Sequence, residues 1–183
     1  MKMRIYSLII GMAIISGSLA LVAQEKRASS RARIGAGVDG AAITLDYARP
    51  KIQEAEPGET RKRWGGVAPY GQAWPVGAGE PALLISDKDL VMGKTTIPAG
   101  TNSLYAWLGE DGTARLVISK QIGEGSTQYD PAQDLARVDM QKEMLNRKVD
   151  PFTMAIVMDP SGGGTLKMMF ENTQYSARFY VRR

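Results

Sequence analysis

Short alternating segments separated by turn-forming residues run through most of this chain, and they constrain its fold more than any other feature. Residues 43–47 alternate apolar with polar side chains, which is the period of a half-buried strand. Residues 101–108 place Tyr105 and Trp107 on one face and aliphatic side chains on the other. About nine such segments are separated by stretches such as "GEDGT" and "PSGGGT", which are typical of hairpin turns. The pattern predicts an all-β domain, an antiparallel β-sandwich or a jelly-roll-like fold.

The N-terminus has the layout of a secretory signal peptide. Lys2 and Arg4 precede an uncharged apolar stretch from Ile5 to Ala23, and small residues stand where cleavage would occur. An uncleaved membrane anchor is the alternative, because this stretch is long enough to cross a bilayer. We expect a signal peptide over residues 1–23 and an exported product, periplasmic or secreted. Residues 24–40 are rich in Arg, Ser and Gly and are interpreted as a flexible linker before a single domain over residues 41–183.

The chain contains no cysteine and no histidine among its 183 residues. Thiol nucleophiles, Ser-His-Asp triads and thiolate zinc sites are therefore excluded. Any acid–base chemistry would fall to carboxylates, lysine or tyrosine. We expect no cofactor and no metal, and the interpretation leans away from an enzyme.

The net charge of +4 lies outside the predicted domain. Residues 41–183 hold 17 basic and 17 acidic side chains, so the predicted domain is neutral. Nucleic-acid-binding domains carry a basic face. The sequence therefore predicts no nucleic-acid partner.

The first candidate site is the segment "WGGVAPYGQAW" and the residues that follow it, up to Glu80. Trp64, Tyr70 and Trp74 surround a Gly-rich loop, and aromatic rings in such a loop can form a stacking platform for a glycan or another small molecule. The alternative is that these rings pack inward and close one end of the sandwich.

The second candidate lies in "TQYDPAQD". Asp130 and Asp134, with Gln128 nearby, could offer oxygen ligands to calcium, and Tyr129 could extend a ligand surface. The alternative interpretation is a helix start, with Asp130 as N-cap and Pro131 at the first helical position.

Carboxylates could also act in pairs. Two of Glu80, Asp130 and Glu171 would suffice for glycoside hydrolysis if they met within about 5 to 9 Å. Solvated surface charge is the alternative. Three arginines could pair with these acids or hold an anionic ligand, or could face solvent: Arg49, Arg137 and Arg178.

Five segments occur in an order that resembles a known family. They are "LDYARP", "GGVAPYGQAW", "KTTIPAGTNSLYAW", "TQYDPAQDLARVDM" and "MFENT", and they span roughly residues 42–180. The chain resembles the exported bacterial proteins known as domain of unknown function number 2911. The resemblance implies a signal peptide and one β-rich domain, and it implies no established activity. Compared with the family pattern, Pro75 stands in place of an arginine and Gly79 in place of an asparagine, which removes two polar side chains suited to orienting a ligand.

These observations together favour a non-catalytic binding or structural module of the bacterial envelope. The predicted ligand surface comprises six residues: Trp64, Tyr70, Trp74, Glu80, Tyr129 and Asp130. One alternative is a glycan hydrolase with Glu80 and Asp130 as the acid–base pair. Another is a protein docking module that uses an exposed sheet edge.

Overall fold

The computed structural model describes residues 29–51, 64–66, 68–123 and 128–182, and these form two antiparallel sheets packed as a sandwich. The predicted all-β sandwich is therefore confirmed. The first sheet comprises eight strands: β1 (Ser30–Val38), β2 (Ala41–Arg49), β3 (Ala73–Pro75), β4 (Gly77–Ala78), β5 (Glu80–Ser86), β8 (Gly100–Leu108), β9 (Ala114–Ser119) and β10 (Asp134–Asp139). The second comprises four: β6 (Leu90–Met92), β7 (Thr95–Ile97), β11 (Gln141–Met158) and β12 (Gly164–Val181). A short 3-10 helix, η2 (Pro131–Gln133), precedes β10.

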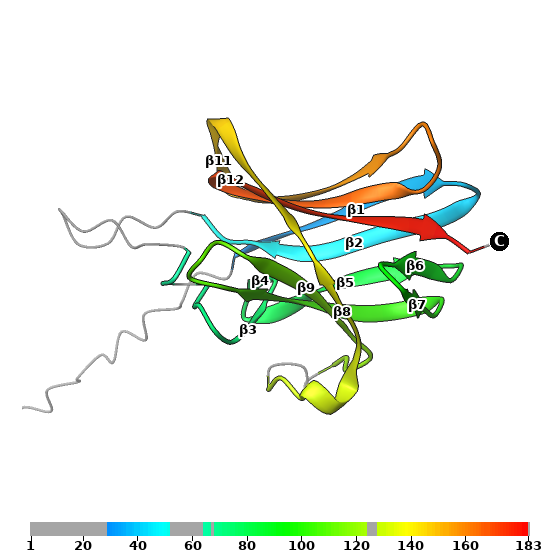
Figure 1. Ribbon diagram of the computed structural model, residues 1–183, viewed down its shortest axis with the longest axis horizontal. Coiled ribbons are helices and arrows are strands. Elements are labelled where there is room, and N and C mark those ends of the chain that lie inside the picture. The colour runs from blue at the N-terminus through cyan, green and yellow to red at the C-terminus, as the bar shows by residue number, and fades with distance from the viewer. Residues whose placement is uncertain (1–28, 52–63, 67, 124–127, 183) are drawn as a thin grey trace, which may run out of the picture.

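The chain passes directly from one layer to the other. The first sheet runs β1-β2-β5-β8-β9-β10, with β3 added beside β8 and β4 beside β5, and the second runs β11-β12-β6-β7. Only Met140 separates β10 from β11, and Figure 1 shows this connection crossing diagonally between the layers. Between the layers lies one apolar core to which nearly every strand contributes.

The prediction of a flexible linker over residues 24–40 is wrong for the part of it that the structure describes. Residues 30–38 form β1, which pairs along its whole length with β2. The turn between them is Asp39-Gly40, with both residues at positive φ (48° and 77°), as tight hairpin turns require. The domain thus begins near Ser30 rather than Ala41. Apolar residues at every second position of β1 pack against the core and explain the strand: Ala32, Ile34 and Ala36.

The C-terminal hairpin is the longest in the described structure: β11 begins at Gln141, and β12 runs without a break from Gly164 to Val181. The first half of β11 is mostly exposed, so it lacks the alternation that marks a half-buried strand. The pairing of β11 with β12 shifts register on both sides of Val149, and Glu171 opposite it has a positive φ of 53°. Both strands continue through this irregularity, as they do at a β-bulge.

None of the described segments is a helix long and apolar enough to span a membrane. The predicted signal peptide, its anchor alternative and the first residues of the predicted linker lie outside the described residues.

The turn between β11 and β12 offers a matched pair of glycine substitutions. Gly163 has φ 74°, its N–H donates to Asp39 Oδ2 at 2.6 Å, and a Cβ there would collide with the carbonyl oxygen of Phe179. Gly71 has nearly the same φ, 72°, with open space around it. In both variants an alanine must adopt a left-handed backbone conformation, which costs about 1–2 kcal/mol. Only Gly163→Ala adds a clash with the backbone. Urea unfolding should show a loss for Gly163→Ala larger by about 2 kcal/mol or more. Equal losses would mean that the turn gives way without cost.

Candidate functional site

Trp74 lies inside the sandwich. Strand β3 pairs with β8 so that Trp74 is opposite Ala106, which directs its indole inward and leaves Ala73 and Pro75 facing outward. The side chain is 6% exposed, and its ring meets Phe152 of the second sheet edge-to-face with centroids 6.0 Å apart. Trp74 therefore offers no ring face to a ligand on the surface.

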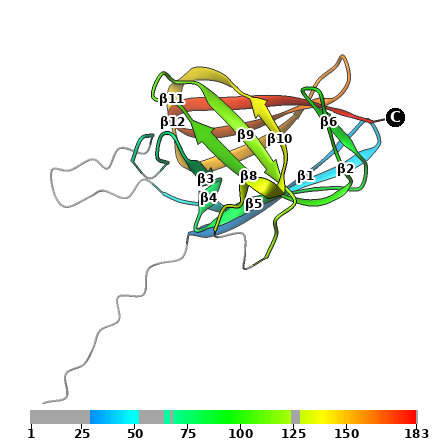
Figure 2. The same ribbon diagram turned by 60° about the horizontal axis from the view of Figure 1, so that its bottom comes forward.

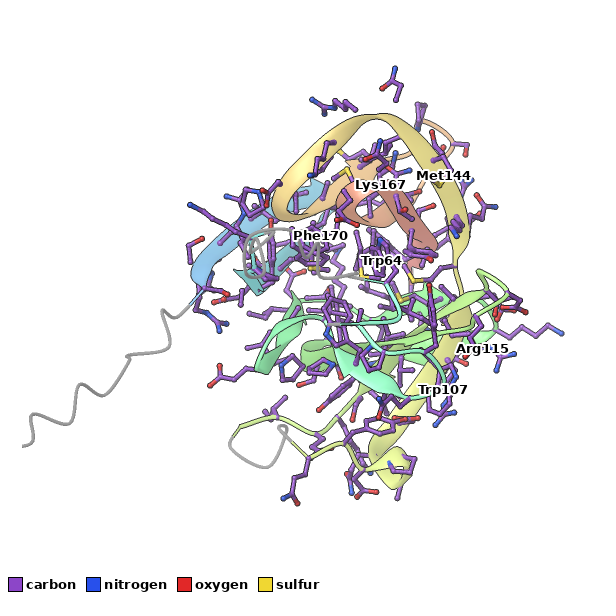
Figure 3. All side chains as sticks on the ribbon, turned by 90° about the vertical axis from the view of Figure 1, so that its left-hand side faces the viewer. Trp64, Trp107, Arg115, Met144, Lys167 and Phe170 are labelled. Atoms are coloured by element: carbon purple, nitrogen blue, oxygen red, sulfur yellow. The ribbon has the colours of Figure 1, made fainter. Side chains whose placement is uncertain are left out.

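Trp64 packs against the same group of rings. Its ring centroid lies 5.2 Å from that of Tyr175 and 6.3 Å from that of Phe170, both in near-perpendicular contacts. Figure 3 shows Trp64 and Phe170 among the side chains in the middle of the molecule. We name this group the interior aromatic cluster: Tyr47, Trp64, Trp74, Phe152, Phe170 and Tyr175.

The remaining residues of the first predicted site lie elsewhere on the surface. Tyr70 is 37% exposed and its ring covers Gly65, where a Cβ would collide with it. Glu80 opens β5 and forms an ion pair with Arg31 at 3.2 Å, with its side chain 70% exposed. The structure thus divides the predicted loop surface into an interior part and an exterior part.

Asp130 is the N-cap of η2. It has an extended backbone, its Oδ1 accepts from the N–H of Ala132 at 2.9 Å, and Pro131 follows it, so the capping alternative is confirmed. The three carboxylates considered for hydrolysis lie on separate elements: Glu80 in β5, Asp130 at η2 and Glu171 in β12 of the other sheet. Within the described ranges, no three acidic side chains are grouped as metal ligands would be.

Two of the three candidate arginines form ion pairs with acidic residues outside that set of three, and the third donates hydrogen bonds to neutral groups. Arg178 forms an ion pair with Asp159 at 2.9 Å, and Arg137 forms one with Asp134 at 2.8 Å. Arg49 donates to the carbonyl oxygen of Phe152 and to Thr153.

A different group of side chains comes together on the outward face of the first sheet. The rings of Tyr105 and Tyr129 lie 5.0 Å apart, and the Tyr129 hydroxyl donates to Asp134 Oδ2 at 2.6 Å. Arg137 Nε donates to the same oxygen at 2.8 Å, its Nη2 donates to the Tyr129 hydroxyl at 2.8 Å, and its guanidinium lies 5.7 Å from the centre of the Trp107 ring. We name Tyr105, Trp107, Tyr129, Asp134 and Arg137 the outer cluster. Four of its members lie on β8 and β10, and Figure 2 shows these two strands with β9 between them.

A bulge in β10 makes this arrangement possible. Residues three apart in a regular strand face opposite sides. The pairing of β10 with β9 shifts between Asp134 and Ala136, so Asp134 and Arg137 both face outward while Leu135 and Ala136 pack on the core. Sequence alternation carries no signal of this bulge. It is the reason that the Asp134–Arg137 pair was not predicted.

Burial and hydrogen bonds raise the pKa of three side chains of the outer cluster, Tyr105, Tyr129 and Arg137. Burial first, and then its hydrogen bond to Asp134, raise the pKa of Tyr129 to about 12, against the opposing influence of Arg137. Burial also raises the pKa of Tyr105, and Asp134 raises it further. The hydrogen bond to Asp134 raises the pKa of Arg137, so this side chain is a fixed cation beside a neutral phenol.

A family model described as "Protein of unknown function (DUF2911)" matches residues 29–179. The chain belongs to this family. The match confirms the family resemblance of the five sequence segments. It also includes β1, in agreement with a domain that begins near residue 30. Neither a curated protein nor a solved structure matches this DUF2911 chain.

The two tryptophans on opposite faces of the first sheet should differ in their effect on stability. Trp74→Ala leaves a cavity between the sheets and should lower the free energy of unfolding by about 3–5 kcal/mol. Trp107 is only partly buried and lies outside the core, so Trp107→Ala should lower it by roughly 1 kcal/mol. Denaturant unfolding monitored by circular dichroism measures both. Similar losses would contradict the assignment of Trp74 to the interior.

The phenol of Tyr129 should titrate near pH 12. Ultraviolet detection of phenolate should show a step at about 12 that is lost in Tyr129→Phe. An unfolded tyrosine ionises near 10, so between these values the unfolded state binds fewer protons and stability falls as pH rises. Tyr180→Phe, which removes a tyrosine of the second sheet, is the control and should leave that step in place. The pKa of Tyr105 is also raised, so the amplitude of the step is the readout. An amplitude that Tyr129→Phe leaves unchanged would refute the assignment.

Proposed function

We propose that this DUF2911 protein is a non-catalytic binding module of the bacterial envelope that takes a glycan on the outer cluster. The observation that carries the proposal is the partly buried ring of Trp107 on a rigid sheet face, flanked by two arginine–aspartate pairs. Figure 3 shows Trp107 and Arg115 close together on this side of the molecule. The exported location rests on the N-terminal sequence, residues 1–23.

The chemistry around Trp107 suits a sugar ring. An indole offers a large apolar face to the C–H groups of a saccharide and has few rotors to immobilise. Arg115 lies opposite Trp107 on β9 and pairs with Asp139 through Nε at 3.0 Å. The guanidinium of Arg137, from β10, lies 5.7 Å from the centre of the Trp107 ring. Sugar hydroxyls both donate and accept, so paired arginines and carboxylates can satisfy them.

This surface is also held in place before any ligand arrives. Tyr129 and Asp134 together hold the guanidinium of Arg137 through three hydrogen bonds or ion-pair contacts of 2.8 Å. Trp107 belongs to β8, which is paired on both sides, with β9 and with β3. A preorganised surface loses less conformational freedom on binding.

The two alternative functions have less support. Glu80 is paired with Arg31, and Asp130 caps η2, so each proposed catalytic carboxylate has a structural role. Two of the four edge strands, β1 and β11, carry residues that oppose addition of a foreign strand: Arg31, Arg33, Lys142, Arg147, Lys148 and Pro151.

Thermal melting of the full-length chain against a panel of envelope oligosaccharides tests the proposal. A ligand that binds only the folded state raises the melting temperature, by an amount equivalent to about 2.7 kcal/mol at one hundred times Kd. Trp107→Ala should weaken binding at least tenfold while the domain remains folded. Met144→Ala changes an exposed side chain of the second sheet and should bind normally. Binding that survives Trp107→Ala, or no shift with any glycan, would refute the proposal.

A further inference from the structure

Two buried polar atoms on the outward face of the first sheet have no hydrogen-bond partner among the described residues. They are the hydroxyl oxygen of Ser103 and Oδ1 of Asp134. Ser103 is 0% exposed, and the side chain of Asp134 is 11% exposed. The other carboxylate oxygen of Asp134 accepts from both Tyr129 and Arg137, so its two oxygens differ completely in their environment.

Strand register places these atoms in one row. Ser103 of β8 is opposite Ser119 of β9, which in turn is opposite Asp134 of β10. The ends of the row are two strand spacings apart, about 9.5 Å between backbones, and both side chains lie on the outward face of the sheet. The Ser119 hydroxyl between them donates to the Gln133 carbonyl at 3.2 Å and accepts from the N–H of Gln121 at 3.1 Å.

We propose that this row is a buried water site, in which one or two ordered water molecules bridge Asp134 Oδ1 and the Ser103 hydroxyl. Buried polar groups in folded proteins are almost always hydrogen-bonded, and ordered water supplies the partner where protein does not. A carboxylate oxygen accepts and a serine hydroxyl both donates and accepts, which matches what water can offer. Calcium and magnesium take six or more oxygens, more than this row provides.

The water would complete the coordination of a carboxylate that organises the outer cluster. Asp134 Oδ2 holds Tyr129 and Arg137, and a hydrogen bond on Oδ1 fixes the rotation of the same group. The site therefore acts as a positioning element for the guanidinium above Trp107. The inference stands independently of the glycan proposal, because it concerns the resting protein.

A crystal structure at about 1.5 Å resolution is the direct test. We expect a density peak 2.7–3.2 Å from Asp134 Oδ1 that reaches the Ser103 hydroxyl directly or through a second water. No peak would overturn the inference. So would a peak 2.3–2.6 Å from several oxygens, because that geometry belongs to a cation.

A pair of serine variants gives an independent reading in solution. Ser86 is 5% exposed and its hydroxyl donates to the Lys88 carbonyl at 2.7 Å, so Ser86→Ala loses a known hydrogen bond. If water satisfies Ser103, Ser103→Ala should lower the melting temperature by a similar amount, about 2–4 °C. If the hydroxyl has no partner, its removal relieves the cost of burial. An unchanged or higher melting temperature for Ser103→Ala would therefore overturn the inference.

Discussion

The contact between Trp74 and Phe152 joins the two sheets, and the rest of the structure depends on it. The chain has no cysteine, so no disulfide links the layers and burial of side chains must hold them together. Trp74 comes from β3 and Phe152 from β11, and the interior aromatic cluster continues this contact through edge-to-face pairs on both sides. Such pairs add about 0.5–1.5 kcal/mol each beyond the area they bury. A Gly-rich loop with two tryptophans is thus explained by the packing of the sandwich.

Strand β8 connects this core to the candidate site. Leu104, Ala106 and Leu108 on its inward face are fully buried, while Tyr105 and Trp107 alternate outward into the outer cluster. Because Trp74 of β3 is opposite Ala106, the packing that fixes Trp74 also fixes the register of β3 beside Trp107. The outer cluster is therefore carried by one of the most buried strands, with β9 and β3 on either side. A site on such a strand keeps its geometry in the absence of a ligand.

The sequence was informative where local period and burial agree, and misleading where they do not. Residues 104–108 alternate aliphatic with aromatic side chains. In the structure the aliphatic ones face the core and the aromatic ones face outward. The Asp39-Gly40 pair is a strong hairpin signal, but the Arg, Ser and Gly residues before it resemble a linker, so β1 was missed. The bulge after Asp134 has no such signal, and a slip of one residue moves a side chain to the other face of a sheet. The candidate site therefore depends on the feature that sequence periodicity describes least well.

The balance of charges on the domain limits the long-range electrostatic attraction that the outer cluster can exert on a charged molecule. Residues 30–183 hold 19 basic and 18 acidic side chains, and each arginine beside Trp107 has an aspartate partner, Asp134 for Arg137 and Asp139 for Arg115. Paired charges on a surface exert little field at a distance, and salt screens what remains. Long-range attraction of an anionic partner is therefore weak here. In the proposed glycan complex, selectivity would come from direct contact with the indole and from the direction of the hydrogen-bonding groups around it. Those directions are set by Tyr129 and Asp134, which both contact the guanidinium of Arg137 beside the ring of Trp107.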